Sequence, residues 1–306
     1  MSLLFFLLCF LCLEFGRRFE IKSVKQMNRV LFKKLSFIAE MLLCLSNFIL
    51  LSIMFAGADS LFFESIGKGI YRFGGILTAL VSIVVVWLGF KKLVKINLVI
   101  VPGMLIVVLC VIINCFTSHC SFEVVDSSIR HNVIFAILNS LSFIASNLFF
   151  AGFFIAKVGN GNTTKTNLFA SFFATFFMLI CILCMVSIIY FNANCFVYDM
   201  PLVFVASSQN VVLGILSKVV VWLGIATTAI TLLYQIVNWL QTYCGGSRLI
   251  EVVVCIFAVL FANLGFSAMI NYFYPLLGVF GMLYIFFMAH RMSICKKEKN
   301  CLRMVK

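Results

Sequence analysis

The sequence predicts an all-α protein, a polytopic bundle of transmembrane helices. Of its 306 residues, 64% are apolar and only 11% are charged, and the mean hydropathy is +1.17. A soluble globular chain is nearer half apolar and a quarter charged, so a soluble fold would have no place for this surplus of apolar side chains. These figures exclude an intrinsically disordered chain, a disulfide-stapled secreted module and a soluble enzyme.

Long apolar segments are the predicted elements of this bundle. A helix rises about 1.5 Å per residue and needs about 20 residues to cross a hydrocarbon core of about 30 Å. Eight segments approach this requirement: Leu35–Ala56, Phe73–Phe90, Ile96–Phe116, Val133–Ala156, Leu168–Tyr190, Val211–Leu240, Leu249–Ala262 and Ser267–Ala289. A ninth, Ser2–Gly16, makes only about 22 Å of helix, which is too short to span comfortably. We therefore expect about nine helices in a single transmembrane domain.

The positive charges indicate the orientation of this bundle. The chain has 23 Lys and Arg against 10 Asp and Glu, a net charge of +13. Lys and Arg concentrate on alternate loops, and the positive-inside rule places those loops in the cytoplasm. The richest are the first loop, with Arg17, Arg18, Lys22, Lys25, Arg29, Lys33 and Lys34, and the predicted basic tail over residues 291–306. We expect a multi-pass protein of the cell membrane with a cytoplasmic C-terminus, whose charge reflects topology and not a nucleic-acid partner.

The start of the chain does not fit this orientation simply. Nine spans with a cytoplasmic tail would place Met1 outside, yet no positive charge precedes Leu3 as an export signal requires. We expect a further span upstream, in a complete unit of ten helices of which this chain begins midway through the second.

Polar residues at membrane depth are the predicted solute site. Ser142, Ser146 and Asn147 interrupt an apolar segment, and polar side chains there can satisfy backbone groups that a local helix break exposes. The alternative is close packing of helices through small residues.

A second polar stripe predicts a cation site. Thr227, Thr231, Tyr234 and Asn238 recur at spacings that place them on one helix face. The hydroxyls of Thr227 and its neighbour Thr228 are hard oxygen ligands that suit a small alkali cation. The alternative is that these hydroxyls bond back to carbonyls of their own helix.

Motifs of catalysis are absent from the sequence. It contains no GxSxG, no phosphate-binding Gly-rich loop ending in Lys-Ser or Lys-Thr, no HExxH, and no His, Cys and carboxylate spacing typical of a metal site. We expect no enzymatic activity, no catalytic residue and no cofactor, with Na⁺ as a candidate coupling ion. The expected partners are a small-molecule solute and the lipid bilayer.

Several short motifs resemble a known family. These are Leu13–Phe19 (LEFGRRF), Phe55–Ala58 (FAGA), Trp87–Phe90 (WLGF) with Lys95–Asn97 and Val101–Pro102, and Phe261–Phe266 (FANLGF) with Tyr274–Pro275. In order and spacing they resemble the YkvI family of bacterial membrane proteins, which is grouped with the amino acid–polyamine–organocation superfamily. The resemblance runs over nearly the whole chain.

The resemblance implies a LeuT-like fold of two five-helix repeats with inverted topology. Residues 2–132 would be the remainder of the first repeat, without its first helix, and residues 133–290 the second. Ser142, Ser146, Asn147 and Tyr234 would then contact substrate, and Thr227 and Thr228 would hold the cation.

The implied function is secondary active transport of a small solute, such as an amino acid, coupled to Na⁺ or H⁺ by alternating access. A solute-sensing membrane protein similar to the germinant-receptor permease subunits is the alternative. The first helix, which supplies half of both sites in the family, is absent under this mapping.

Overall fold

The computed structural model describes residues 2–66, 72–88, 91–117, 133–192, 195, 198–245 and 248–297. Every regular element in these ranges is a helix, and none of the ranges contains a strand. The predicted all-α class is thereby confirmed. The helices are α1 (Ser2–Phe19), α2 (Val24–Phe32), η1 (Lys33–Leu35), α3 (Ser36–Ile66), α4 (Phe73–Leu88), α5 (Lys91–Thr117), α6 (Val133–Gly159), α7 (Thr164–Phe191), α8 (Pro201–Gln209), α9 (Val211–Cys244), α10 (Leu249–Phe261), η3 (Ala262–Leu264) and α11 (Phe266–Lys297).

Each of the nine predicted segments coincides with one long helix. The largest boundary difference is in α3, which continues ten residues beyond the predicted end at Ala56. The first seven residues of the predicted tail also belong to a helix, because α11 continues to Lys297. Two nine-residue helices, α2 and α8, were not predicted.

Several helices have the length and composition of membrane spans. Within the described residues, five segments are long and apolar enough to cross a bilayer: Val24–Phe63, Ile137–Gly159, Thr164–Tyr190, Val211–Tyr243 and Phe266–Ile294. Three shorter apolar helices accompany them, at Phe73–Leu88, Pro102–Asn114 and Leu249–Leu264. The chain is therefore a helical membrane protein, and the number of nine spans stays a prediction.

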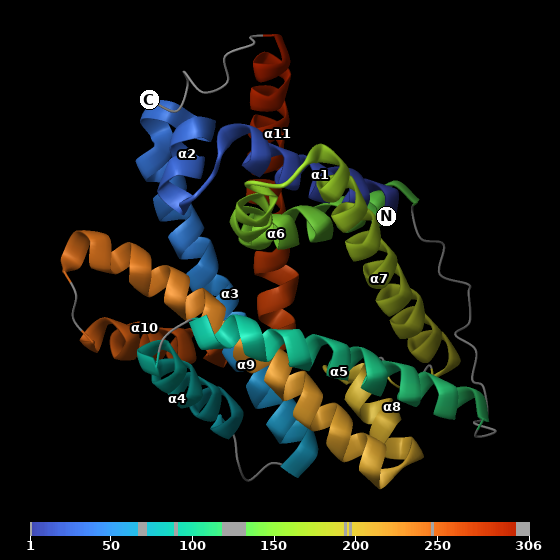
Figure 1. The fold of residues 1–306 in the computed structure, drawn as a ribbon. Coiled ribbons are helices and arrows are strands. Elements are labelled where there is room, and N and C mark those ends of the chain that lie inside the picture. The colour runs from blue at the N-terminus through green and yellow to red at the C-terminus, as the bar shows by residue number, and fades with distance from the viewer. Residues whose placement is uncertain are drawn as a thin grey trace. The chain divides into compact units, whose positions relative to one another are not determined.

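The chain divides into two compact units, and the first consists of Met1–Ser46, Arg130–Ile180 and Asn271–Lys306. Helices α1 and α6 pack against each other in this unit (Figure 1). Glycine permits the close approach, since a Cβ on Gly16 would overlap the backbone of Ala156 and one on Gly159 would overlap that of Leu13. An apolar core that includes Phe15, Met27, Ile144, Phe149, Tyr284 and Met288 lies among α1, α2, α6 and α11.

The second unit consists of Asn47–Ile129 and Cys181–Ile270. Its central element is α9, which contacts α4, α5, α8 and α10 (Figure 1). Two hydrogen bonds attach other helices to α9: Trp222 donates to the Thr78 hydroxyl of α4 at 3.1 Å, and Asn47 of α3 donates to Gln235 at 3.2 Å. Each unit contains residues from both sides of the predicted repeat boundary at residue 132.

Candidate functional site: a charged cavity in the second unit

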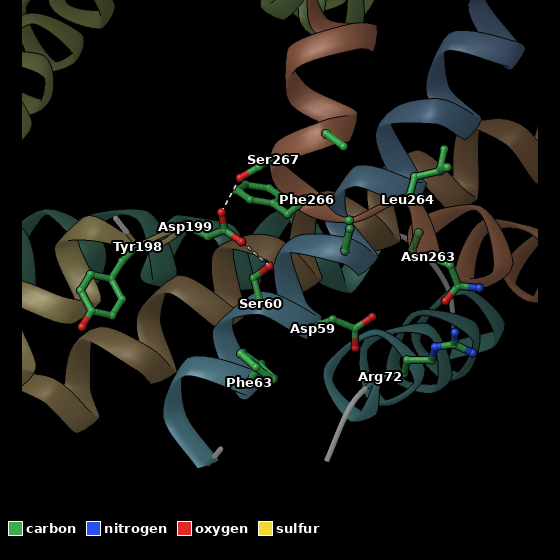
Figure 2. A pocket seen from close by; sticks show the side chains of 14 residues that line it. Asp59, Ser60, Phe63, Arg72, Tyr198, Asp199, Asn263, Leu264, Phe266 and Ser267 are labelled. Atoms are coloured by element: carbon green, nitrogen blue, oxygen red, sulfur yellow. Dashed lines mark hydrogen bonds between the residues drawn. The ribbon is translucent and has the colours of Figure 1, made fainter. Parts of the chain in front are cut away.

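A cavity of about 720 Å³ lies in the second unit, where four segments meet. Its walls come from the C-terminal part of α3, the residue before α4, the segment before α8, and the turn between η3 and α11 (Figure 2). Polar and charged groups are unusually dense here for so apolar a chain. The lining includes Asp59, Ser60, Arg72, Tyr198, Asp199, Asn263 and Ser267.

Asp199 joins two helices at one wall of the cavity. Ser60 of α3 donates its hydroxyl to Asp199 Oδ2 at 2.9 Å, and Ser267 in the first turn of α11 donates to Oδ1 (Figure 2). An anion is favoured beside the first turn of a helix by the helix dipole. The preceding side chain, Tyr198, stacks on Phe204 of α8 with a ring-centroid distance of 4.0 Å. These contacts fix the position of the Asp199 carboxylate.

Asp59 lies one residue before Ser60 and contacts the start of α4. Its Oδ1 accepts a hydrogen bond from the backbone N–H of Gly75 at 2.7 Å. The first N–H groups of a helix have no partner within it, so this carboxylate satisfies one of them. Gly74 and Gly75 permit the contact, because a Cβ on Gly74 would overlap the backbone of Ala58 and one on Gly75 would lie 2.8 Å from Asp59 Oδ2.

Arg72 supplies the positive charge of the lining. It precedes α4, is exposed, and has a backbone φ of 75°, in the left-handed region that is uncommon for residues other than glycine. Its guanidinium interacts electrostatically with Asp59, and the two side chains lie at the same side of the cavity (Figure 2). The lining thus contains two carboxylates and one guanidinium, with Asp199 and Arg72 on different walls.

Aromatic side chains make the apolar part of the lining. Phe63, Tyr198 and Phe266 contribute rings, and the ring of Phe266 would lie 3.0 Å from a Cβ on Gly57. The turn before α11 requires Gly265, whose φ is 86°. Ring faces attract cations, so aromatic and carboxylate groups together favour a ligand with a positively charged nitrogen. The guanidinium of Arg72 can donate two parallel hydrogen bonds to an anionic group on the same ligand.

The predicted substrate residues of α6 belong to the first unit, and none of them is a lining residue of this cavity. Ser146 is fully buried and donates to the carbonyl of Phe143 at 2.9 Å, while Asn147 is exposed and donates to the same carbonyl at 2.8 Å. Ser142 lies where α6 meets α11, because a Cβ on Gly278 would overlap its hydroxyl. These residues share one helical segment. Ser146 and Asn147 both donate within their own helix, and Asn147 also makes a side-chain hydrogen bond with Tyr274 of α11.

The predicted cation residues lie on α9 in the second unit. Thr227 and Thr228 both donate to the carbonyl of Gly224, at 3.2 and 2.8 Å. Thr227 is buried, whereas Thr228 is exposed. A hydroxyl that donates in this way keeps its lone pairs as acceptors. Tyr234 is half-buried on the same helix, and it belongs to a different unit from the Ser142 segment.

The charged residues of the cavity were not predicted as a site. Asp59 and Ser60 lie beyond the predicted end of their helix, and Arg72 lies just before the predicted segment Phe73–Phe90. One signal was available at Asp199, an acidic residue two positions before Pro201, because acidic residues and proline are both typical of helix starts. Nothing in the sequence indicated that Ser60 and Ser267 would meet the same carboxylate.

No protein-family model, curated protein or solved structure matches this chain. Within the described ranges, no group of three or more His, Cys, Asp or Glu side chains is arranged to hold a metal ion.

Proposed function

We propose that this chain is a membrane carrier that binds a small polar solute in the charged cavity and moves it by alternating access, coupled to Na⁺ or H⁺. The observation that carries this proposal is the cavity itself. Charged groups at the ends of apolar helices are unfavourable unless they meet water, each other or a ligand. A volume of about 720 Å³ also lies within the range typical of small-molecule sites.

The charges of the lining favour a small zwitterion, such as an amino acid. An ammonium group would lie between Asp199 and the aromatic rings, and a carboxylate would contact Arg72. The hydroxyls of Ser60 and Ser267 already donate to Asp199, so that carboxylate is oriented before a solute arrives. A site that is already ordered binds more tightly, because less conformational freedom is lost on binding.

The cavity is proposed as the outer entry to the carrier. All four of its segments belong to loops or helix ends that the positive-inside pattern assigns to the non-cytoplasmic face. In the resemblance to LeuT-like carriers, Ser142, Ser146, Asn147 and Tyr234 would contact the solute deeper in the membrane. Thr227 and Thr228 would hold the cation through the lone pairs of their hydroxyls, which both donate to the carbonyl of Gly224.

Uptake by reconstituted protein tests this proposal. Proteoliposomes should accumulate one or more members of a panel of radiolabelled amino acids when a Na⁺ or H⁺ gradient is imposed. Asp199→Asn and Arg72→Gln should abolish accumulation, while Glu20→Gln, which removes an exposed charge of the first unit, should leave it unchanged. Saturable binding without gradient-driven accumulation would instead support a solute sensor. The absence of both binding and uptake would overturn the assignment of the cavity.

A further inference from the structure

We propose that α2 presents a basic face that binds the phosphate headgroups of anionic phospholipids at the membrane surface. The surface is defined by Lys22, Lys25, Arg29 and Lys33, and is called the basic face below. This inference concerns the first unit and does not depend on the solute cavity.

The ends of α2 are well defined. Ser23 is the N-cap, and its hydroxyl accepts a hydrogen bond from the backbone N–H of Gln26 at 3.1 Å. The side chain of Gln26 accepts in return from the backbone N–H of Lys22 at 2.9 Å, so two donors at the helix start are satisfied. At the other end Lys33 has a φ of 50°, and the chain turns there before α3. The helix is therefore a separate short element with a fixed register.

The two faces of α2 differ sharply in character. Met27, Val30 and Leu31 are buried in the apolar core of the first unit. The four residues of the basic face are all exposed. Lys25 and Arg29 lie four positions apart within α2 and therefore on the same side of the helix. Lys22 immediately precedes the N-cap, and Lys33 is the C-cap residue. A basic amphipathic helix of this kind is typical of a membrane-surface element.

Polar contacts hold the buried face in place. Tyr284 donates to the side-chain oxygen of Asn28 at 2.9 Å, and both residues are buried. The guanidinium of Arg291 donates to the carbonyl of Leu31 through Nε at 3.3 Å and through Nη2 at 3.2 Å. All three bonds attach α2 to α11. The basic face is thus fixed in orientation, and binding an anion to it requires little ordering of the backbone.

The basic face also keeps its charge. Arg17 and Arg18 both bind the carboxylate of Glu14, at 2.6 and 2.9 Å, which offsets part of their charge. The four side chains of the basic face make no ion pair with any residue that the structure describes. They therefore remain available to external anions.

The chain after α2 identifies the anion as a lipid headgroup. Leu35, Phe37, Ile38 and Met41 are exposed apolar side chains that follow directly, and they need a hydrocarbon environment. Helix α3 alone has 31 residues, or about 46 Å of helix, which exceeds a hydrocarbon core of about 30 Å. The basic residues that precede it can then lie outside the hydrocarbon, at the level of the phosphates. A nucleic acid would not match this adjoining apolar surface.

Lipid titration of the purified full chain tests this proposal. The detergent-solubilised protein is titrated with phosphatidylglycerol and with phosphatidylcholine, and native mass spectrometry gives the ratio of the two affinities. The test variant carries Lys22→Gln, Lys25→Gln and Arg29→Gln. The control variant carries Lys157→Gln, Lys165→Gln and Arg248→Gln, which removes the same charge from other exposed positions. Thermal unfolding of both variants in detergent verifies that they are folded.

The wild type and the control variant should prefer phosphatidylglycerol, and the test variant should lose at least about ten-fold of that preference. Added salt should reduce the wild-type preference towards that of the test variant. An equal loss in both variants would overturn the proposal, since it would reflect net charge alone. An oligonucleotide that competes with phosphatidylglycerol for the wild type at equal affinity would also overturn it.

Discussion

The hydroxyl of Ser60 donates a 2.9 Å hydrogen bond to the carboxylate of Asp199, which connects α3 to the segment before α8 in the wall of the cavity. The Asp199 carboxylate has two oxygens and accepts from Ser267 through the other one. Residues that are 139 positions apart in the sequence thereby fix one charge. Asp199 therefore has a structural role, in addition to the binding role that is proposed for it.

We expect Asp199→Asn to weaken solute binding more than it weakens the fold. The amide keeps the shape and one acceptor oxygen, so the free energy of unfolding should fall by only about 1 kcal/mol. A charged hydrogen bond to a solute ammonium contributes about 1.5–3 kcal/mol, so the affinity for the best ligand of the amino-acid panel should fall about ten- to hundred-fold. Saturation binding and thermal unfolding measure the two effects, with Glu20→Gln as control. Equal affinity in Asp199→Asn and wild type would contradict the binding role.

Tyr284→Phe should destabilise the first unit. The change removes the donor to Asn28, whose side-chain oxygen would then be buried without a partner, while its Nδ2 already has none among the described residues. Leaving one buried polar group unsatisfied costs about 1–3 kcal/mol. Chemical denaturation in detergent micelles measures the loss. Tyr272→Phe is the matched control, because Tyr272 is 78% exposed, and a loss as large in that variant would refute the explanation.

Gly159→Ala should disrupt the contact between α1 and α6. The added methyl would overlap the Leu13 backbone, which a side-chain rotation cannot relieve. Overpacking of this kind costs about 1–3 kcal/mol or more. The control is Gly152→Ala in the same helix, where no described atom lies within 4 Å of an added Cβ. Alanine should be neutral or stabilising there because of its higher helix propensity. Equal melting temperatures of the two variants would disprove this explanation of the contact between α1 and α6.

The proposed cation site predicts a Na⁺ effect that depends on Thr228. Na⁺ should raise the melting temperature of the wild-type protein relative to K⁺ at equal ionic strength, because a ligand that binds the folded state stabilises it. Thr228→Val keeps the side-chain shape and should remove this shift. Thr175→Val is the control, because the Thr175 hydroxyl also donates to its own helix, to Ser171 at 2.7 Å. An identical Na⁺ shift in all three proteins would exclude Thr228 as a ligand.

The predicted orientation can be tested by cysteine labelling. In a background without reactive native cysteines, Asn263→Cys in the turn before α11 and Lys25→Cys on α2 both introduce exposed thiols. A membrane-impermeant maleimide applied to intact cells should label Cys at 263 and label Cys at 25 only after the cells are opened. The opposite pattern would reverse the orientation of the chain.

The sequence predicted the long helices well and the short ones poorly. An apolar segment such as Val211–Leu240 has one stable arrangement in a bilayer, because its backbone must satisfy its own hydrogen bonds. The nine residues of α2 are too few and too polar for such a signal. Ser23 and Gln26 form a capping pattern in the sequence, yet this pattern is short and common. Only the structure, in which Met27 and Leu31 are buried, shows that it starts a packed helix.

For the polar residues, the sequence indicated relationships within one helix but not between separate segments. Thr227 was chosen because it belongs to a helical period and Thr228 because its hydroxyl is adjacent, and the bonds of both to Gly224 lie within that same helix. Asp59, Arg72 and Asp199 could not be grouped in this way, since they come from three separate segments. All three lie outside the predicted apolar segments, where no helix period connects them.

By itself the sequence determined that this protein is a bundle of apolar helices, and it predicts that most of the positive charges lie on one side of a membrane. Apolar length and charge position act locally, and the bilayer imposes the same response on any chain that has them. Only the tertiary structure decided which polar groups meet. A hydrogen bond such as that from Ser60 to Asp199 depends on how α3 packs beside the segment that precedes α8, and side chains of both segments set that packing together.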